Sequence, residues 1–230
     1  MKFFDGLYNY EIVLLVLGVL LFLVALAKLI RGKANAGLVV FFLLSVSMIG
    51  YPSVQSIDYQ KGVFSIKKQV HDLEADPGNE ALRTSLQQNI VKVEGRPSKE
   101  PETDLTLAQA HFALGNEADA KAKLAAATQK KADLPEASDL SKKIELSDRL
   151  KAQTAKVEAA PNDTAARAQL DQTVSQVNQT RIANPTTLHN VTRAQTILKA
   201  QPAATRPDAV MSPTLRNRLA IVPNAATSHQ

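Results

Sequence analysis

The amino-acid sequence predicts an all-α protein in three parts: an N-terminal two-helix transmembrane hairpin (1–55), a helical-repeat domain or α-solenoid (56–201) and an extended C-terminal tail (202–230). The apolar runs 12–30 and 36–54 are each long enough for a helix to cross ~30 Å of hydrocarbon. After them, apolar residues recur three and four positions apart, as in an amphipathic helix. Val- and Ile-rich alternating runs are missing, which argues against a β-domain.

Composition narrows the classes of function. The chain has a formal net charge of +5, and its basic residues are spread along the sequence among acidic ones. A nucleic-acid-binding protein concentrates its basic residues on one face, so we expect no nucleic-acid partner. The absence of cysteine excludes disulfides, thiolate metal sites and a cysteine nucleophile.

The first apolar run predicts a retained span and not a cleaved signal peptide. Its leader carries Lys2 against Asp5 and Glu11, whereas a signal peptide begins with a net positive segment. The run exceeds the ~7–15 apolar residues of a signal core, and a second span follows closely. Gly18, Ser45 and Ser47 are small residues that would let the two helices approach each other.

The turn between the spans predicts the direction of the hairpin, because short basic loops stay in the cytoplasm. The basic residues at this turn are Lys28, Arg31 and Lys33. We therefore expect the loop 31–35 to be cytoplasmic, with the chain in the bacterial inner membrane and the C-terminal domain in the periplasm. Three cations that follow the second span count against this direction: Lys61, Lys67 and Lys68.

Proline and glycine divide the chain into helices. Pro52, after Gly50 and Tyr51, predicts that the second span kinks or ends there, since proline has no N–H for the helix. Pro77 and Gly115 mark later helix boundaries. We expect seven helices after the hairpin, with the ranges 56–75, 79–94, 102–114, 117–130, 137–159, 163–181 and 185–200.

Two segments of the helical region, 66–114 and 150–198, resemble each other under a shift of 84 residues without a gap. Such self-similarity is the sequence signature of a repeat architecture. The identical pairs include Pro77/Pro161, Arg83/Arg167, Leu86/Leu170, Val93/Val177 and Pro101/Pro185. The sequence therefore predicts an internal duplication.

Residues 104–127, DLTLAQAHFALGNEADAKAKLAAA, resemble a tetratricopeptide repeat, and the likeness is looser over 56–201. The resemblance implies antiparallel helix pairs that stack, share a core and hold a peptide or helix in a groove. Residues that match the family's small and large packing positions are Leu107, Ala108, Gly115, Ala120, Leu124 and Ala127.

The tail after Gln201 contains four prolines and no long amphipathic face, so it is expected to be extended. Within it, the segment 215–222 (LRNRLAIV) combines apolar and basic residues and could dock on a partner, although a flexible tail gives the same composition by chance. The apolar residues of this segment are Leu215, Leu219, Ile221 and Val222.

No catalytic, cofactor or metal motif is found in the sequence. The four histidines are isolated, and no Gly-rich phosphate loop or GxSxG elbow is present. The acidic run 72–80 is similar to a calcium loop, but Pro77 stands where that loop needs glycine and Arg83 where it needs its bidentate glutamate. We therefore expect no enzyme and no cofactor.

Three classes of function are consistent with these features. The first is a membrane-anchored scaffold or accessory subunit that binds other subunits of a membrane complex, or an extended peptide. The second is a component of cell-envelope assembly or secretion that binds an envelope polymer or a secreted peptide. The third, a small oligomeric channel or lysis protein, ranks last because neither span carries an ionisable residue at its centre.

Overall fold

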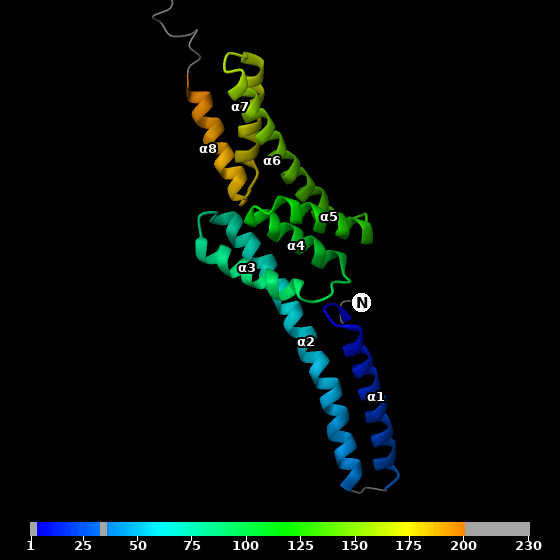
Figure 1. Cartoon of the computed structure of the whole chain (residues 1–230). Helices are drawn as coiled ribbons and strands as arrows, with labels where there is room; N and C mark the ends of the chain where they lie inside the picture. The colour runs from blue at the N-terminus through cyan, green and yellow to red at the C-terminus, as the bar shows by residue number, and fades with distance from the viewer. Residues whose placement is uncertain (1–3, 33–35, 201–230) are drawn as a thin grey trace, which may run out of the picture.

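The computed structural model describes residues 4–32 and 36–200. Within these residues all regular structure is helical apart from turns, which confirms the all-α prediction at that level. Figure 1 shows the helices in order along an elongated molecule, with α1 and the first half of α2 side by side at one end. The helices are α1 (Asn9–Ile30), α2 (Ala36–Ala75), α3 (Glu80–Glu94), α4 (Pro101–Leu114), α5 (Glu117–Lys130), α6 (Pro135–Ala159), α7 (Thr164–Gln179) and α8 (Pro185–Lys199).

Of the two outcomes expected at Pro52, a kink or an end of the helix, the structure excludes the second, because α2 continues through this residue. The predicted helices 36–54 and 56–75 form one helix of 40 residues with Pro52 inside it. The proline removes one backbone donor, but the side chains of Pro52 and Ser56 are buried, so packing holds the helix together on both sides. The expected division between 1–55 and 56–201 therefore falls within a helix that both parts share.

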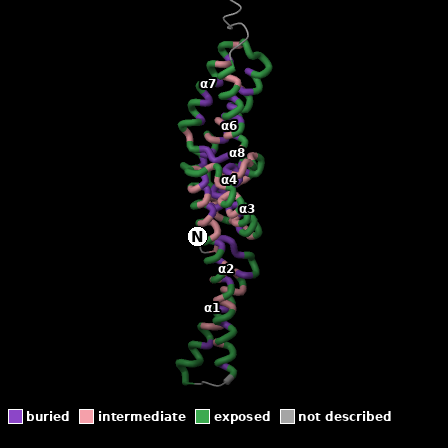
Figure 2. Tube along the Cα trace, turned by 90° about the vertical axis from the view of Figure 1, so that its left-hand side faces the viewer, coloured by how far each residue is buried: buried purple, intermediate pink, exposed green. Residues whose placement is uncertain are grey.

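Helices α1 and α2 are each long and apolar enough to cross a membrane by length and composition. Only 11% of each apolar window is buried, and Figure 2 shows that the hairpin is exposed along most of its length. The two helices contact each other at Gly18, where an added Cβ would lie 2.9 Å from Met48 Cβ. Farther along, the rings of Phe22 and Phe42 lie 5.2 Å apart. The close approach expected at Gly18 is therefore present.

Replacing Gly18 with leucine should loosen the hairpin, because Met48 and Ile49 occupy the space that the new side chain needs. Overpacking of this kind typically costs about 1–3 kcal/mol. Gly50→Leu is the matched control, since a Cβ at Gly50 meets nothing within 4 Å. Thermal unfolding in detergent should show a lower Tm for Gly18→Leu alone; equal Tm values would contradict the packing.

The interior of the domain beyond the hairpin, which we call the head, consists of two apolar clusters on opposite faces of α4. One face of α4 packs against α2 and α3, around the fully buried Ile66, Leu73 and Leu86. The other face contributes Leu105 and Phe112 to a cluster with α5, α6, α7 and α8. Because α4 is packed on both faces, ten of its fourteen residues are buried. Helix α4 is the central element of the head.

The shift of 84 residues relates the helix boundaries of the two halves of the head. Helices α2 and α6 end at Ala75 and Ala159, and helices α4 and α8 begin at Pro101 and Pro185. The side chains at the paired positions are buried alike: Ile66 and Leu150, Leu73 and Val157, Leu86 and Leu170, Ala110 and Ala194.

Two arginines related by the same shift make the same kind of contact. Arg83 donates to the carbonyl of Ala113 at 3.2 Å, near the end of α4. Arg167 donates to the carbonyl of Leu198 at 2.9 Å, near the end of α8. Each guanidinium therefore supplies a donor to the unsatisfied carbonyls of a helix C-terminus. The shared sequence pattern is thus accompanied by a shared hydrogen-bonding role.

Helix α8 differs from α4 on the face that would receive a further helix. Leu105, Ala108 and Phe112 of α4 are buried. The residues 84 positions later on α8 are polar and exposed: His189, Thr192 and Thr196. A polar outer face is characteristic of the terminal unit in a stack of helices. Among the described residues, no further helix packs on this face of α8.

Candidate functional site

The structure places the expected packing residues in the interior of the head. Leu107 contacts the cluster with α2 and α3, whereas Ala108, Ala120 and Ala127 lie in the other cluster with no exposed surface. Leu124 is only half-buried at the edge of that cluster. Gly115 ends α4 with φ +91°, and an added Cβ would lie 3.1 Å from Pro185.

The residues expected to set membrane direction are far from the head. Lys28 lies in the last turn of α1 and Arg31 caps that helix, and both are exposed. Lys33 lies outside the described residues, as do the expected docking residues of the tail: Leu215, Leu219, Ile221 and Val222.

A buried polar junction joins the N-terminal segment to the head, and no local sequence pattern indicates it. Asp5 is 4% exposed and lies at the start of α4. Its carboxylate accepts the backbone N–H of Lys99 at 2.6 Å, the N–H of Glu100 at 3.3 Å and the hydroxyl of Thr103 at 2.8 Å. These bonds fix the segment that leads into α4, and the acid complements the positive end of the helix dipole.

Arg96 is the second element of the junction. Its guanidinium donates to the carbonyl of Gly6 at 3.0 Å and to Gln55, and it lies 3.4 Å from the carboxylate of Glu11. Glu11 is 1% exposed and also accepts the backbone N–H of Tyr8 at 2.9 Å. Arg96 therefore links the N-terminal segment, α1 and α2 to the loop before α4.

Backbone contacts close the junction. The N–H of Gly6 donates to the carbonyl of Pro97 at 3.1 Å, and the hydroxyl of Tyr8 donates to the carbonyl of Gly95 at 2.6 Å. Gly6 has φ +75°, and an added Cβ would lie 2.2 Å from the ring of Tyr59. The N-terminal segment is thus fixed between α2 and the α3–α4 loop, so the head cannot swing freely about the hairpin.

A groove opens on the head between α2, α4 and α6. It has a volume of about 730 Å³, within the usual range for ligand-binding clefts. Phe112, Ala113 and Leu140 form part of an apolar floor, and Leu146 is half-buried beside them. The ring of Phe64 stands at the mouth and is 72% exposed. The floor and mouth together offer apolar surface to a partner side chain.

Charges line the rim of the groove, and its carboxylates are paired. Glu136 lies 3.1 Å from Lys67, Asp139 lies 3.6 Å from Lys142, and Glu74 is paired with Lys143. Lys68 lines the same groove and makes no ion pair with a described residue. Within the described part of the chain, the rim therefore has an unpaired positive charge at Lys68, whereas the three carboxylates named above are each paired with a lysine.

His111, which is isolated from the other histidines in the sequence, has a carboxylate partner in the structure. It is 5% exposed, and its Nε2 lies 3.0 Å from Glu94, whose carboxylate is also 2.9 Å from Lys123. Burial raises the pKa of Glu94, but the hydrogen bonds from His111 and Lys123 outweigh it and hold that pKa below its usual 4.5. Among the described residues, no group of three or more His, Asp or Glu side chains is arranged to hold a metal.

The lowered pKa of Glu94 makes its contribution to stability depend on pH. Since the pKa is lower in the folded chain, the ionised carboxylate stabilises the fold above pH 4.5, and this contribution is lost as the pH falls through the folded value. Glu94→Gln should therefore lower the free energy of unfolding at pH 6 and match the wild type in acid. Urea unfolding across this range measures both; a deficit that persists in acid would contradict the assignment.

Comparisons of the chain with protein-family models, with curated proteins and with solved structures find no match. The function must therefore be inferred from the structure itself: the exposed apolar hairpin, the buried polar junction and the groove.

Proposed function

We propose that this chain is a membrane-anchored scaffold or accessory subunit that holds a partner protein in the groove of its head. The single observation that supports this proposal most strongly is the continuity of α2. The helix that forms half of the apolar hairpin extends without a break to Phe64 and His71 on the wall of the groove. A partner bound there would be held at a fixed height above the bilayer.

The junction supports a scaffolding role and not a flexible tether. Asp5 and Arg96 join the N-terminal segment to the head through buried polar contacts. A head that is already fixed in place loses less conformational entropy when it binds a partner than a flexibly tethered head would. We further propose that the α4–α5 pair is a tetratricopeptide-like unit and that the head is a short α-solenoid.

For localisation, we propose the bacterial inner membrane, with the loop 31–35 in the cytoplasm and the head in the periplasm. The support is the pair of exposed cations at the end of α1, Lys28 and Arg31. Protease added to intact spheroplasts should degrade the head under this proposal. Protection of the head until the membrane is opened would reverse the direction.

The groove is tested by filling it. Gln109 lines the groove on α4 and is half-buried, so Gln109→Trp should obstruct it. Gln129→Trp adds the same side chain to the exposed surface of α5 and serves as the control. The full chain in mild detergent should recover a partner in fixed stoichiometry, and Gln109→Trp alone should lose it. Equal recovery of the partner by both variants would show that it does not bind in the groove.

A further inference from the structure

The outer face of α2 carries a row of accessible residues that continues from the hairpin to the groove. The row follows alternating steps of three and four, so all its members lie on one side of the helix. Its members, all exposed except the half-buried Gly50, are Ser47, Gly50, Val54, Ile57, Lys61, Phe64, Lys68 and His71, which we call the α2 seam. The seam spans 24 residue steps, which corresponds to about 36 Å of helix.

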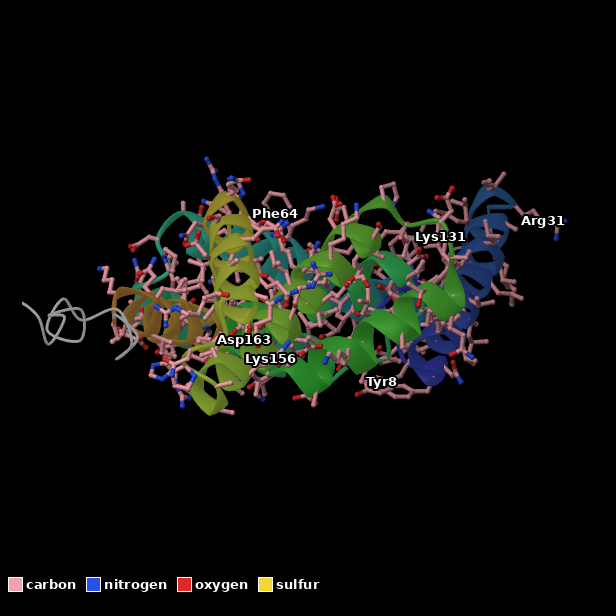
Figure 3. The ribbon with its side chains drawn as sticks, turned by 90° about the horizontal axis from the view of Figure 1, so that it is seen from above. Tyr8, Arg31, Phe64, Lys131, Lys156 and Asp163 are labelled. Atoms are coloured by element: carbon pink, nitrogen blue, oxygen red, sulfur yellow. The ribbon has the colours of Figure 1, made fainter. Side chains whose placement is uncertain are left out.

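The α2 seam faces away from the partners that α2 already has. The buried face of α2 toward α1 and the head includes Ser45, Ser56 and Tyr59. Positions two residues apart are about 200° apart around a helix, so Val54 and Ile57 point away from that face. In Figure 3, Phe64 and Tyr8 are seen on opposite sides of the molecule. The seam is thus open while α1 remains packed.

The lower part of the seam is suited to close approach by another helix. An added Cβ at Gly50 meets nothing within 4 Å, so this chain's own packing does not require glycine there, whereas at Gly18 it does. Ser47 lies one turn below Gly50 and is exposed. Small residues three or four apart allow the backbones of membrane helices to come together.

The upper part of the seam carries apolar surface between unpaired cations. Ile57 is 52% exposed and Phe64 is 72% exposed. Both line a hollow of about 410 Å³ on the outer side of α2, and Phe64 also borders the main groove. Lys61 and Lys68 flank Phe64, and neither makes an ion pair with a described residue. An occupant would therefore need apolar residues opposite Ile57 and Phe64 and acidic residues opposite the lysines.

We propose that the α2 seam binds one helix of a second membrane protein, which crosses the bilayer beside α2 and continues outside it as an acidic amphipathic helix. Steps of three and four between apolar contacts are the spacing of a left-handed helix pair. Continuity of the seam across the hairpin places the partner's span beside Ser47 and Gly50. Charge complementarity places its carboxylates beside Lys61 and Lys68. This inference rests on the proposed membrane scaffold and names its partner class.

The probe is a designed single-span peptide in phosphatidylcholine nanodiscs that hold the full chain. Its span continues into a helix with leucines at steps of three and four and with glutamates placed opposite the two lysines. A second peptide has lysines in place of the glutamates. Because the chain has no cysteine, Ala75→Cys gives a unique donor-dye site at the exposed end of α2, and the peptide carries the acceptor.

We expect energy transfer to show at least tenfold tighter binding of the glutamate peptide. The double change Lys61→Glu/Lys68→Glu should reverse the preference, and Phe64→Ala should weaken binding about tenfold, as truncation of a central aromatic contact does. The matched controls are Lys151→Glu/Lys156→Glu on α6 and Val91→Ala on α3, which change exposed residues away from the seam and should leave binding unchanged. Gly50→Leu should abolish binding while the chain remains folded.

Three results would overturn the proposal: equal binding of the two peptides, a preference that survives reversal of the lysines, or energy transfer between two labelled copies of the chain that Phe64→Ala abolishes. The last would assign the seam to a second copy. A chain that fails to enter the nanodiscs would instead refute the membrane anchor itself, so the two failures are distinguishable.

Discussion

Arg96→Ala should strongly destabilise the protein by opening the junction between the hairpin and the head. It removes the cation that pairs with Glu11, and that carboxylate would remain buried at 1% exposure. Breaking a buried ion pair by removing one partner typically costs about 3–5 kcal/mol. Three further contacts, to Gly6, Gln55 and the ring of Tyr8, are lost with it. Thermal unfolding in detergent should show a large fall in Tm.

The control for Arg96 is Arg149→Ala. Arg149 pairs with Glu145 at 2.7 Å on the exposed surface of α6, where such a pair contributes about 0.3–0.5 kcal/mol. Limited proteolysis gives a second measurement, because release of the junction should expose the α3–α4 loop near Arg96 to cleavage. If the two variants unfold at the same temperature, Arg96 does not hold the junction together.

Gly6→Ala should have an effect of similar size through a different cause. With φ +75°, an alanine at this position costs about 1–2 kcal/mol in backbone strain. Its Cβ would also lie 2.2 Å from the ring of Tyr59, which is 4% exposed and cannot move aside without disturbing its neighbours. Overpacking adds about 1–3 kcal/mol. Urea unfolding measures the total.

Gly32→Ala separates these two contributions. Gly32 has φ +72°, but an added Cβ there meets nothing within 4 Å. This control should therefore show only the backbone cost of about 1–2 kcal/mol. If Gly6→Ala were no more destabilising than Gly32→Ala, the ring of Tyr59 would not lie against Gly6 in solution.

Opening the junction should affect the position of the head and leave the binding groove intact. A variant released at Arg96 should retain its groove, because Phe112 and Leu140 belong to a cluster that does not include the junction. The head of this variant should nevertheless move relative to the bilayer, and a bound partner should move with it. Partner recovery in detergent would then persist while the height of the head above a supported bilayer becomes variable.

Local sequence patterns determined most of the helices. Proline at the first position explains why α4 and α8 begin at Pro101 and Pro185, and the side chains of Asn79 and Asp163 cap α3 and α7. Capping and apolar spacing act within one or two turns of helix. The sequence alone therefore also revealed the 84-residue pattern, which consists of such local signals. Hydropathy alone likewise showed the two apolar helices.

Only the tertiary structure decided what happens at Pro52 and at the junction. Proline disfavours a helix locally, but burial of Pro52 and Ser56 against neighbouring elements keeps α2 continuous, and this packing energy is invisible in a local pattern. Asp5 bonds to Thr103, 98 residues away along the chain, and Arg96 bonds to Gly6, 90 residues away. The sequence thus determined which segments are helices and which are apolar, while long-range polar contacts decided how the head is fixed to the hairpin.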